Sequence, residues 1–107
     1  MDKQKLFKKF KAEHPDWNDE QVWSRVAIDI QTDKAVDEGK NLNSKDIWNT
    51  IITKARDWLK EVLPVVYEKV KEVFATIIKK IKEFVNEHRG EILEVIVKYI
   101  GNALAGV

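Results

Sequence analysis

The residues of this chain best suited to chemistry are its two histidines, His14 and His88. His14 lies beside Pro15 and just before Asp16, and a His–Asp pair can serve as an acid–base couple. No Ser, Thr or Tyr stands near this pair in the sequence for the imidazole to activate. We therefore interpret His14 as a turn or helix-end residue.

His88 lies among the carboxylates Glu87, Glu91 and Glu94. If one helix ran through this region, His88 and the two later glutamates could line one side of it and hold a divalent ion. Gly90 interrupts such a helix, and one histidine with surface carboxylates is not a zinc pattern. We interpret His88 as a residue near a helix C-terminus, where it complements the helix dipole.

Composition excludes further classes of chemistry. The chain has no cysteine, so disulfides, thiolate zinc sites and a cysteine nucleophile are excluded. Its four glycines are scattered and form no phosphate-binding loop, and no nucleophile elbow is present. We expect no enzymatic activity, no cofactor, no metal and no small-molecule substrate.

Charge is nearly balanced, with 19 Lys and Arg residues against 18 Asp and Glu residues. A nucleic-acid-binding protein normally carries a basic excess on one face, so we expect no nucleic-acid partner. Five lysines near the N-terminus could meet phosphates, but we interpret them as a solvated helix face. They are Lys3, Lys5, Lys8, Lys9 and Lys11.

Segment 65–88 separates apolar from charged residues almost without error on a helical wheel. Its apolar residues fall within roughly 140° of arc, and its Lys and Glu residues occupy the other side. The apolar set is Val66, Val70, Val73, Phe74, Ile77, Ile78, Ile81, Phe84 and Val85. A stripe this wide must be buried against this chain, another chain or a membrane, and we take the core of the chain's own bundle as the leading explanation.

The same periodicity predicts an all-α fold. We expect a single compact bundle of four to five helices, at about 2–13, 19–38, 45–63, 65–88 and 91–104. The bundle forms one domain, 1–107, with a more polar, Trp-bearing region at 1–43 followed by strongly amphipathic helices at 44–107.

Local signals predict where helices begin and end. Pro15 ends the first helix, because the residue before a proline is pushed out of the α region. Asn18 is a good N-cap, and Gln21 can complete a capping box with it. Trp17 and Val22 occupy the staple positions around this cap.

The start of the third helix and its junction with the fourth leave alternatives open. Asn43 or Ser44 can cap the third helix. Pro64 directly follows the expected third helix, and no Gly, Asn or Ser stands between them to form a loop. One long bent helix and two helices with an abrupt corner both fit the pattern, and we favour a break or sharp kink.

The second helix has a less regular wheel. Val22, Trp23, Val26, Ala27 and Ile30 form its expected buried face. Ile28 points away from that face, as either a lone surface residue or part of a second contact.

We assign most of the tryptophans to the core. Trp23, Trp48 and Trp58 lie on predicted buried stripes, although indole also serves as a binding hot spot.

These features favour a non-enzymatic helical protein that acts through protein–protein interaction, as an adaptor, inhibitor, immunity-type protein or small subunit. A protein partner or self-association is expected. The broad apolar face of 91–104 is the candidate interaction surface, formed by Ile92, Ile96, Tyr99, Ile100 and Leu104.

The alternative is a membrane-active amphipathic protein of the bacteriocin or pore-former type, which would lie on a membrane surface. We find no secretory signal, so a cytoplasmic location is the default, with leaderless secretion as the other route.

Overall fold

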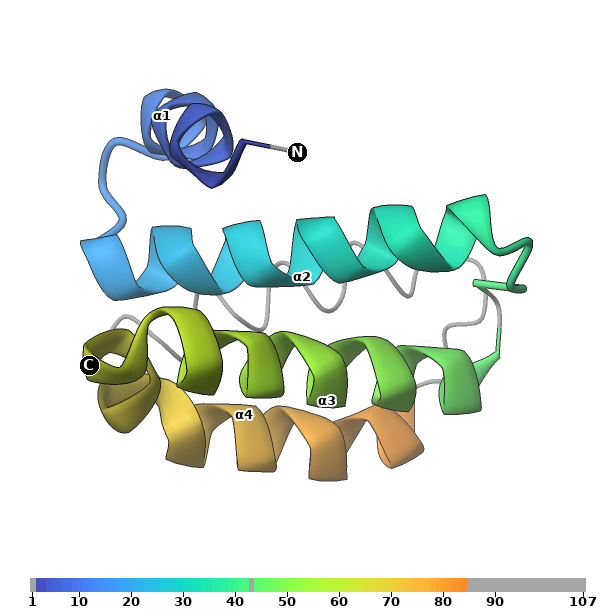
Figure 1. Cartoon of the computed structure of the whole chain (residues 1–107). Coiled ribbons are helices and arrows are strands. Elements are labelled where there is room, and N and C mark those ends of the chain that lie inside the picture. Colours follow the sequence, from blue (N-terminus) through green and yellow to red (C-terminus); the bar gives the residue numbers. More distant parts are fainter. Residues whose placement is uncertain (1, 43, 85–107) are drawn as a thin grey trace.

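The computed structural model describes residues 2–42 and 44–84. Within these residues it has four helices: α1 (Lys3–Glu13), α2 (Asp19–Asp37), α3 (Lys45–Val62) and α4 (Pro64–Phe84). Figure 1 shows α2, α3 and α4 side by side, with α1 crossing one end of α2. α2 contacts each of the other three helices, and α3 packs along α4. The predicted all-α bundle is confirmed for this part of the chain.

α1 begins and ends as the sequence predicts. The Asp2 carboxylate accepts a hydrogen bond from the Gln4 backbone N–H at 2.9 Å and so caps the first turn. His14 follows the last helical residue with φ −130° and ψ 69°, outside the α region that Pro15 disfavours. The His14 backbone N–H still donates to the Phe10 carbonyl at 2.9 Å, which closes the final turn.

The capping box at the start of α2 is present. Asn18 Oδ1 accepts from the Gln21 backbone N–H at 2.8 Å, and Gln21 Oε1 accepts from the Asn18 backbone N–H at 2.7 Å. Trp17 and Val22 both belong to the small apolar cluster beneath α1, where a staple would place them. The start of α2 is therefore fixed by local hydrogen bonds and by tertiary packing together.

Two apolar clusters lie on opposite sides of α2. The α1 core, between α1 and α2, has Phe10, Val22 and Val26 at its centre. The main core, between α2, α3 and α4, has eleven buried residues at its centre: Ala27, Ile28, Ala35, Trp48, Ile51, Ile52, Ala55, Leu59, Val70, Phe74 and Ile77.

This two-sided burial explains the irregular wheel of α2. Ile28 is fully buried in the main core, so of its two interpretations the second contact is right and the surface residue is wrong. Val22 and Val26 face α1 on the other side of the helix. A helix with apolar residues on both sides is central to its bundle.

α3 and α4 are separate helices with a corner at Leu63. Leu63 has φ −133° and ψ 66°, which ends α3 at Val62. Its N–H donates to the Leu59 carbonyl at 2.8 Å, and its carbonyl accepts from the Tyr67 N–H at 2.9 Å. Pro64 is the first residue of α4, where its missing N–H would have had no partner within the helix.

The apolar stripe of α4 packs within the chain over its described length. Val70, Phe74 and Ile77 are at most 1% exposed and lie in the main core. Val66, Val73 and Ile78 pack against the same cluster at its margin. The bundle core therefore accounts for this stripe up to Ile78.

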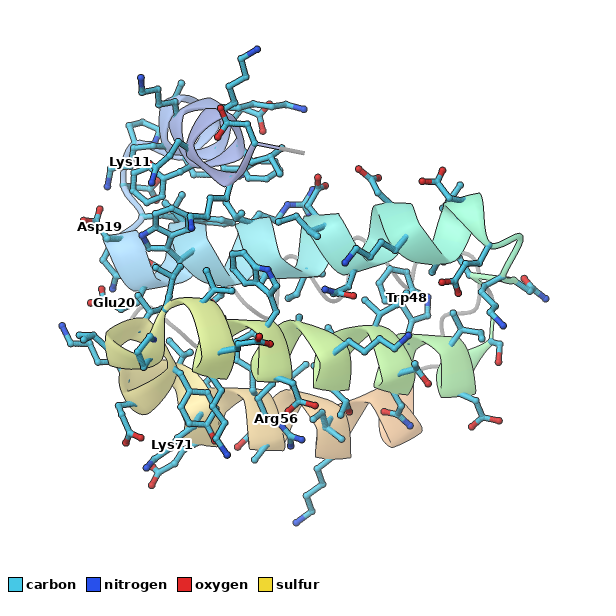
Figure 2. The ribbon with its side chains drawn as sticks, in the orientation of Figure 1. Lys11, Asp19, Glu20, Trp48, Arg56 and Lys71 are labelled. Carbon is cyan, nitrogen blue, oxygen red and sulfur yellow. The ribbon has the colours of Figure 1, made fainter. Side chains whose placement is uncertain are left out.

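The tryptophans divide between interior and margin. Trp48 is 1% exposed and lies between α2 and α3 (Figure 2), where its indole N–H donates to the Leu42 carbonyl. Trp23 and Trp58 are half-buried and touch both cores, so their assignment to the core holds only in part. Ser44 is the N-cap residue of α3, without a side-chain cap bond.

Candidate functional site

His14 has a structural environment. Its ring stacks on Trp17 with centroids 3.8 Å apart and planes 7° from parallel. Its carbonyl accepts from the Trp17 backbone N–H at 3.0 Å. Within the described residues we find no hydrogen bond between this imidazole and Asp16. The expected role of His14 at a helix end agrees with this geometry.

The other sequence-based candidates lie outside the described residues. These are His88 with its neighbouring glutamates, and the surface formed by Ile92, Ile96, Tyr99, Ile100 and Leu104. Asn43, the alternative cap of α3, also lies outside them. Among residues 2–42 and 44–84, no three His, Cys, Asp or Glu side chains gather closely enough to hold a metal ion.

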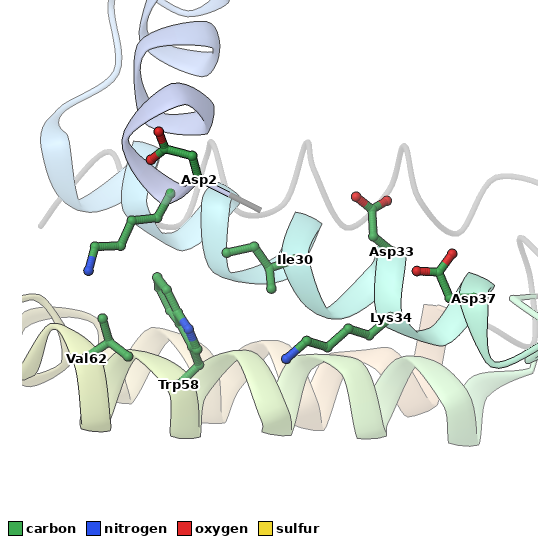
Figure 3. A pocket seen from close by; sticks show the side chains of 8 residues that line it. Asp2, Ile30, Asp33, Lys34, Asp37, Trp58 and Val62 are labelled. Atoms are coloured by element: carbon green, nitrogen blue, oxygen red, sulfur yellow. The ribbon is translucent and has the colours of Figure 1, made fainter.

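A solvent-open pocket of about 630 Å³ lies where α1, α2 and α3 meet. We call it the Trp58 pocket (Figure 3). α1 and its cap contribute two lining residues, α2 contributes four and α3 two. They are Asp2, Lys3, Ile30, Asp33, Lys34, Asp37, Trp58 and Val62. Its volume is within the range of ligand pockets, which bind a drug-sized molecule or a few side chains.

Helical spacing brings the α2 and α3 residues together. Asp33 and Asp37 are four residues apart, so they share one face of α2, with Ile30 one turn before Asp33. Trp58 and Val62 have the same spacing on α3. Trp58 is only half-buried, so part of its indole is uncovered.

The pocket combines an apolar wall with a charged rim. Ile30, Trp58 and Val62 form the wall, and each is only half-buried. Val36 and Val65 are the large apolar side chains of the described region that are exposed, and several others are half-buried at the margins of the two cores. A partly uncovered indole beside two aliphatic side chains is a favourable contact surface.

Three carboxylates and two ammonium groups surround this wall: Asp2, Asp33 and Asp37 against Lys3 and Lys34. None of the five forms an ion pair within 4 Å in the described region. The rim is therefore slightly acidic. Asp2 also caps α1, whereas Asp33 and Asp37 form no ion pair in the described region.

Asp29 lies one turn before Asp33 on α2, and its carboxyl group is partly buried. Burial raises the pKa of Asp29, and the nearby Asp33 carboxylate raises it further. Arg25 and Lys9 act in the opposite direction but do not reverse the shift. Asp29 therefore loses its charge more readily than an ordinary aspartate as the pH falls.

The pocket does not follow from the sequence alone. Ile30 and Trp58 lie on predicted buried faces, and the sequence of one helix does not predict which neighbouring helices cover such a face. The pair Asp33 and Asp37 was the available signal, since like charges at i and i+4 are unfavourable unless a ligand or solvent compensates them.

Comparisons with known proteins do not assign the chain to a class. No protein-family model, no curated protein and no solved structure matches it. Among the described helices, none has the length and apolar character needed to span a bilayer.

Proposed function

We propose that this chain is a non-catalytic helical binding protein whose Trp58 pocket receives a segment of a protein partner. The observation that carries the proposal is the half-buried indole of Trp58, set between Ile30 and Val62 and bordered by unpaired carboxylates. Trp58 also packs against both cores, and Ile30 packs against the α1 core. In this pocket, half-buried apolar side chains and carboxylates line the same cavity.

The chemistry of the pocket specifies the partner segment. An apolar side chain would pack on the Trp58 wall, where burial of apolar area stabilises the complex. A neighbouring Lys or Arg would lie against Asp33 and Asp37, and a cation can also lie over the indole face. We therefore expect a segment that presents an apolar residue next to a basic one.

The membrane-active alternative has less support from the fold. Val70, Phe74 and Ile77 of the α4 stripe are buried in the main core, so this part of the stripe offers no apolar face to a bilayer in the folded state. Vesicle leakage separates the two functions. We expect no leakage from anionic vesicles at concentrations at which the chain stays folded.

Site-specific photo-cross-linking tests the proposal. A photoreactive phenylalanine analogue replaces Trp58 in one variant and Ala75 in a control variant. Ala75 is exposed on α4, which contributes nothing to the pocket. We expect position 58, and not position 75, to cross-link one identifiable protein in an extract of the source cells.

The cross-linked protein is then purified and its affinity measured. Trp58→Ala and the double variant D33N/D37N should each weaken binding by about tenfold or more, corresponding to about 1.4 kcal/mol. The double variant keeps the packed indole, so it tests the pocket even if Trp58→Ala disturbs the fold. Equal cross-linking at both positions, or an affinity unchanged in D33N/D37N, would contradict the proposal.

A further inference from the structure

α1 is held to the bundle differently from the other helices. Among the described helices only α2 packs along it, and α1 crosses one end of α2 (Figure 1). The α1 core has three buried residues at its centre, against eleven in the main core on the other side of α2. A helix held by a small, separate apolar cluster can open while the rest of the chain stays folded.

Two polar side chains of α2 lose water where α1 covers them. The Arg25 guanidinium lies over the Phe10 ring, 4.9 Å from its centre, and this cation–π contact favours docking. Arg25 Nε, however, is buried without a hydrogen bond in the described region, which is costly for a donor. The Asp29 carboxylate, near Lys9 and Glu13 of α1, is partly buried as well. Both groups regain water when α1 moves away, so docking of α1 is opposed by their desolvation.

The face beneath α1 is an apolar strip on an acidic helix. We call it the α1 seat, and it consists of Val22, Trp23, Val26 and Ile30 of α2 with Trp58 of α3. Ile30 and Trp58 also line the Trp58 pocket, so the seat and the pocket are continuous. The α2 sequence has five carboxylates against one Arg and one Lys. Such a surface favours an apolar helix with basic flanks.

α1 itself shows which kind of segment fits the seat. Leu6, Phe7 and Phe10 pack against its apolar residues. The α1 sequence has five lysines and one glutamate, the opposite balance to α2. The Lys11 ammonium lies 3.7 Å from the Asp19 carboxylate at the start of α2. Apolar side chains at positions i, i+1 and i+4, flanked by lysines, therefore match the seat in both shape and charge.

We propose that α1 is a displaceable cover, and that the α1 seat binds a basic amphipathic helix of the partner in place of α1. This inference rests on the proposed function: the partner segment that presents an apolar residue next to a basic one is a helix, and it reaches the Trp58 pocket along the seat. Because α1 is tethered to α2, it competes at a high effective concentration. Docked α1 therefore weakens binding of the partner.

Peptide binding to the full chain tests the α1 seat. The probe is a fluorescent peptide with the sequence of residues 2–14, and Phe10→Ala weakens the chain's own α1. We expect this variant to bind the peptide about tenfold or more tightly than the unmodified chain, because its α1 competes less. Lys8→Ala, at an exposed position of α1, is the matched control and should bind the peptide as the unmodified chain does. Hydrogen exchange at Ile51 and Ile52, buried in α3, verifies that the main core stays folded.

Changes in the peptide test the chemistry of the seat. K9Q/K11Q removes the two lysines near Asp29 and Asp19 and should weaken binding about threefold. K5Q/K8Q changes two lysines that are exposed on α1 and should bind as the parent peptide does. Equal affinities of these two peptides would overturn the basic character proposed for the partner helix.

Two further results would overturn the displacement of α1. One is an unchanged peptide affinity in Phe10→Ala and also in Phe7→Ala, which weakens α1 through its ring contact with Trp23. The other is a dimer of the unmodified chain that the peptide dissociates, because the seat would then belong to a second copy. The peptide experiments do not use the cross-linked partner, so their failure is distinguishable from a failure of the Trp58 pocket.

Discussion

The Lys69 ammonium lies 2.9 Å from the Glu20 carboxylate and joins α4 to the first turn of α2. The two residues are 49 positions apart in the chain, so the contact forms only in the folded state. The hydrogen bond from Lys69 lowers the pKa of Glu20, with a further contribution from backbone hydrogen bonding. Because Glu20 is the less exposed partner, at 18%, this ion pair is screened less than the others on the surface.

This pair predicts a pH dependence of stability. The pKa of Glu20 is lower in the folded chain than its ordinary value of 4.5, so its stabilising contribution is complete above that pH. The contribution is lost as the pH falls through the folded pKa. Thermal unfolding at neutral pH should give a coupling of about 0.2–1 kcal/mol in a double-mutant cycle of Glu20→Gln and Lys69→Met.

The matched control is the pair of Lys71 and Glu68, 2.7 Å apart within α4. Both of these residues are exposed and solvent screens their attraction, so Glu68→Gln should leave stability nearly unchanged at any pH. A coupling between Glu20 and Lys69 that is the same at pH 3 and pH 7 would show that the ion pair does not contribute as described.

Asp29 predicts the opposite pH dependence. Burial raises its pKa above the ordinary value of 3.8, so the ionised carboxylate destabilises the fold once the pH exceeds that value. Asp29→Asn should therefore stabilise the chain at pH 7, by up to about 1 kcal/mol because the group is only partly buried. Below pH 3.8 the two proteins should unfold alike. Lower stability of the variant at pH 7 would mean that attraction to Arg25 outweighs desolvation.

Ile28 tests the two-sided burial of α2. Its side chain is fully buried in the main core, so Ile28→Ala removes contacts and leaves a cavity. We expect a loss of about 2–5 kcal/mol in the free energy of unfolding, measured by urea denaturation. Val36→Ala, at a position 54% exposed on the same helix, should cost less than about 0.5 kcal/mol. Comparable losses at the two positions would contradict the central placement of α2.

The positions of the helices in this fold could be predicted from local sequence signals. The faces that these helices bury could be predicted only in part. The capping box of Asn18 and Gln21 can be predicted from the sequence because its hydrogen bonds join residues only three positions apart. Ile28 remained ambiguous because one wheel cannot say whether a helix has neighbours on one side or two. Burial was predicted correctly where a helix has its apolar residues on one side only, as at Val70 and Phe74 of α4.

The candidate site was beyond a sequence-based prediction for a related reason. The Trp58 pocket combines residues from three helices, and Asp2 and Trp58 line the same pocket because α1 crosses over α2. Inter-helix angles depend on the packing of all the side chains between the helices. The interaction surface predicted at 91–104 lies outside the described residues and stays a prediction.

Trp48 provides a test of the link between α3 and the preceding loop. Its indole N–H donates to the Leu42 carbonyl, and the ring is buried. Trp48→Phe keeps most of the apolar contact but leaves that acceptor without its donor, for an expected cost of about 1–3 kcal/mol. Trp23→Phe, which removes an indole N–H with no hydrogen bond in the described region, should cost less. Equal costs by chemical denaturation would argue against the Trp48 hydrogen bond.

The most direct test of the proposed function is the response of the four indole N–H resonances when the cross-linked partner is added. Trp58 lines the pocket, whereas Trp48 is buried and bonded to Leu42, so one chain contains both probe and internal control. Binding in the Trp58 pocket predicts a large saturable shift of the Trp58 resonance and almost none for Trp48. A complex that forms with the Trp58 resonance unmoved would contradict the account.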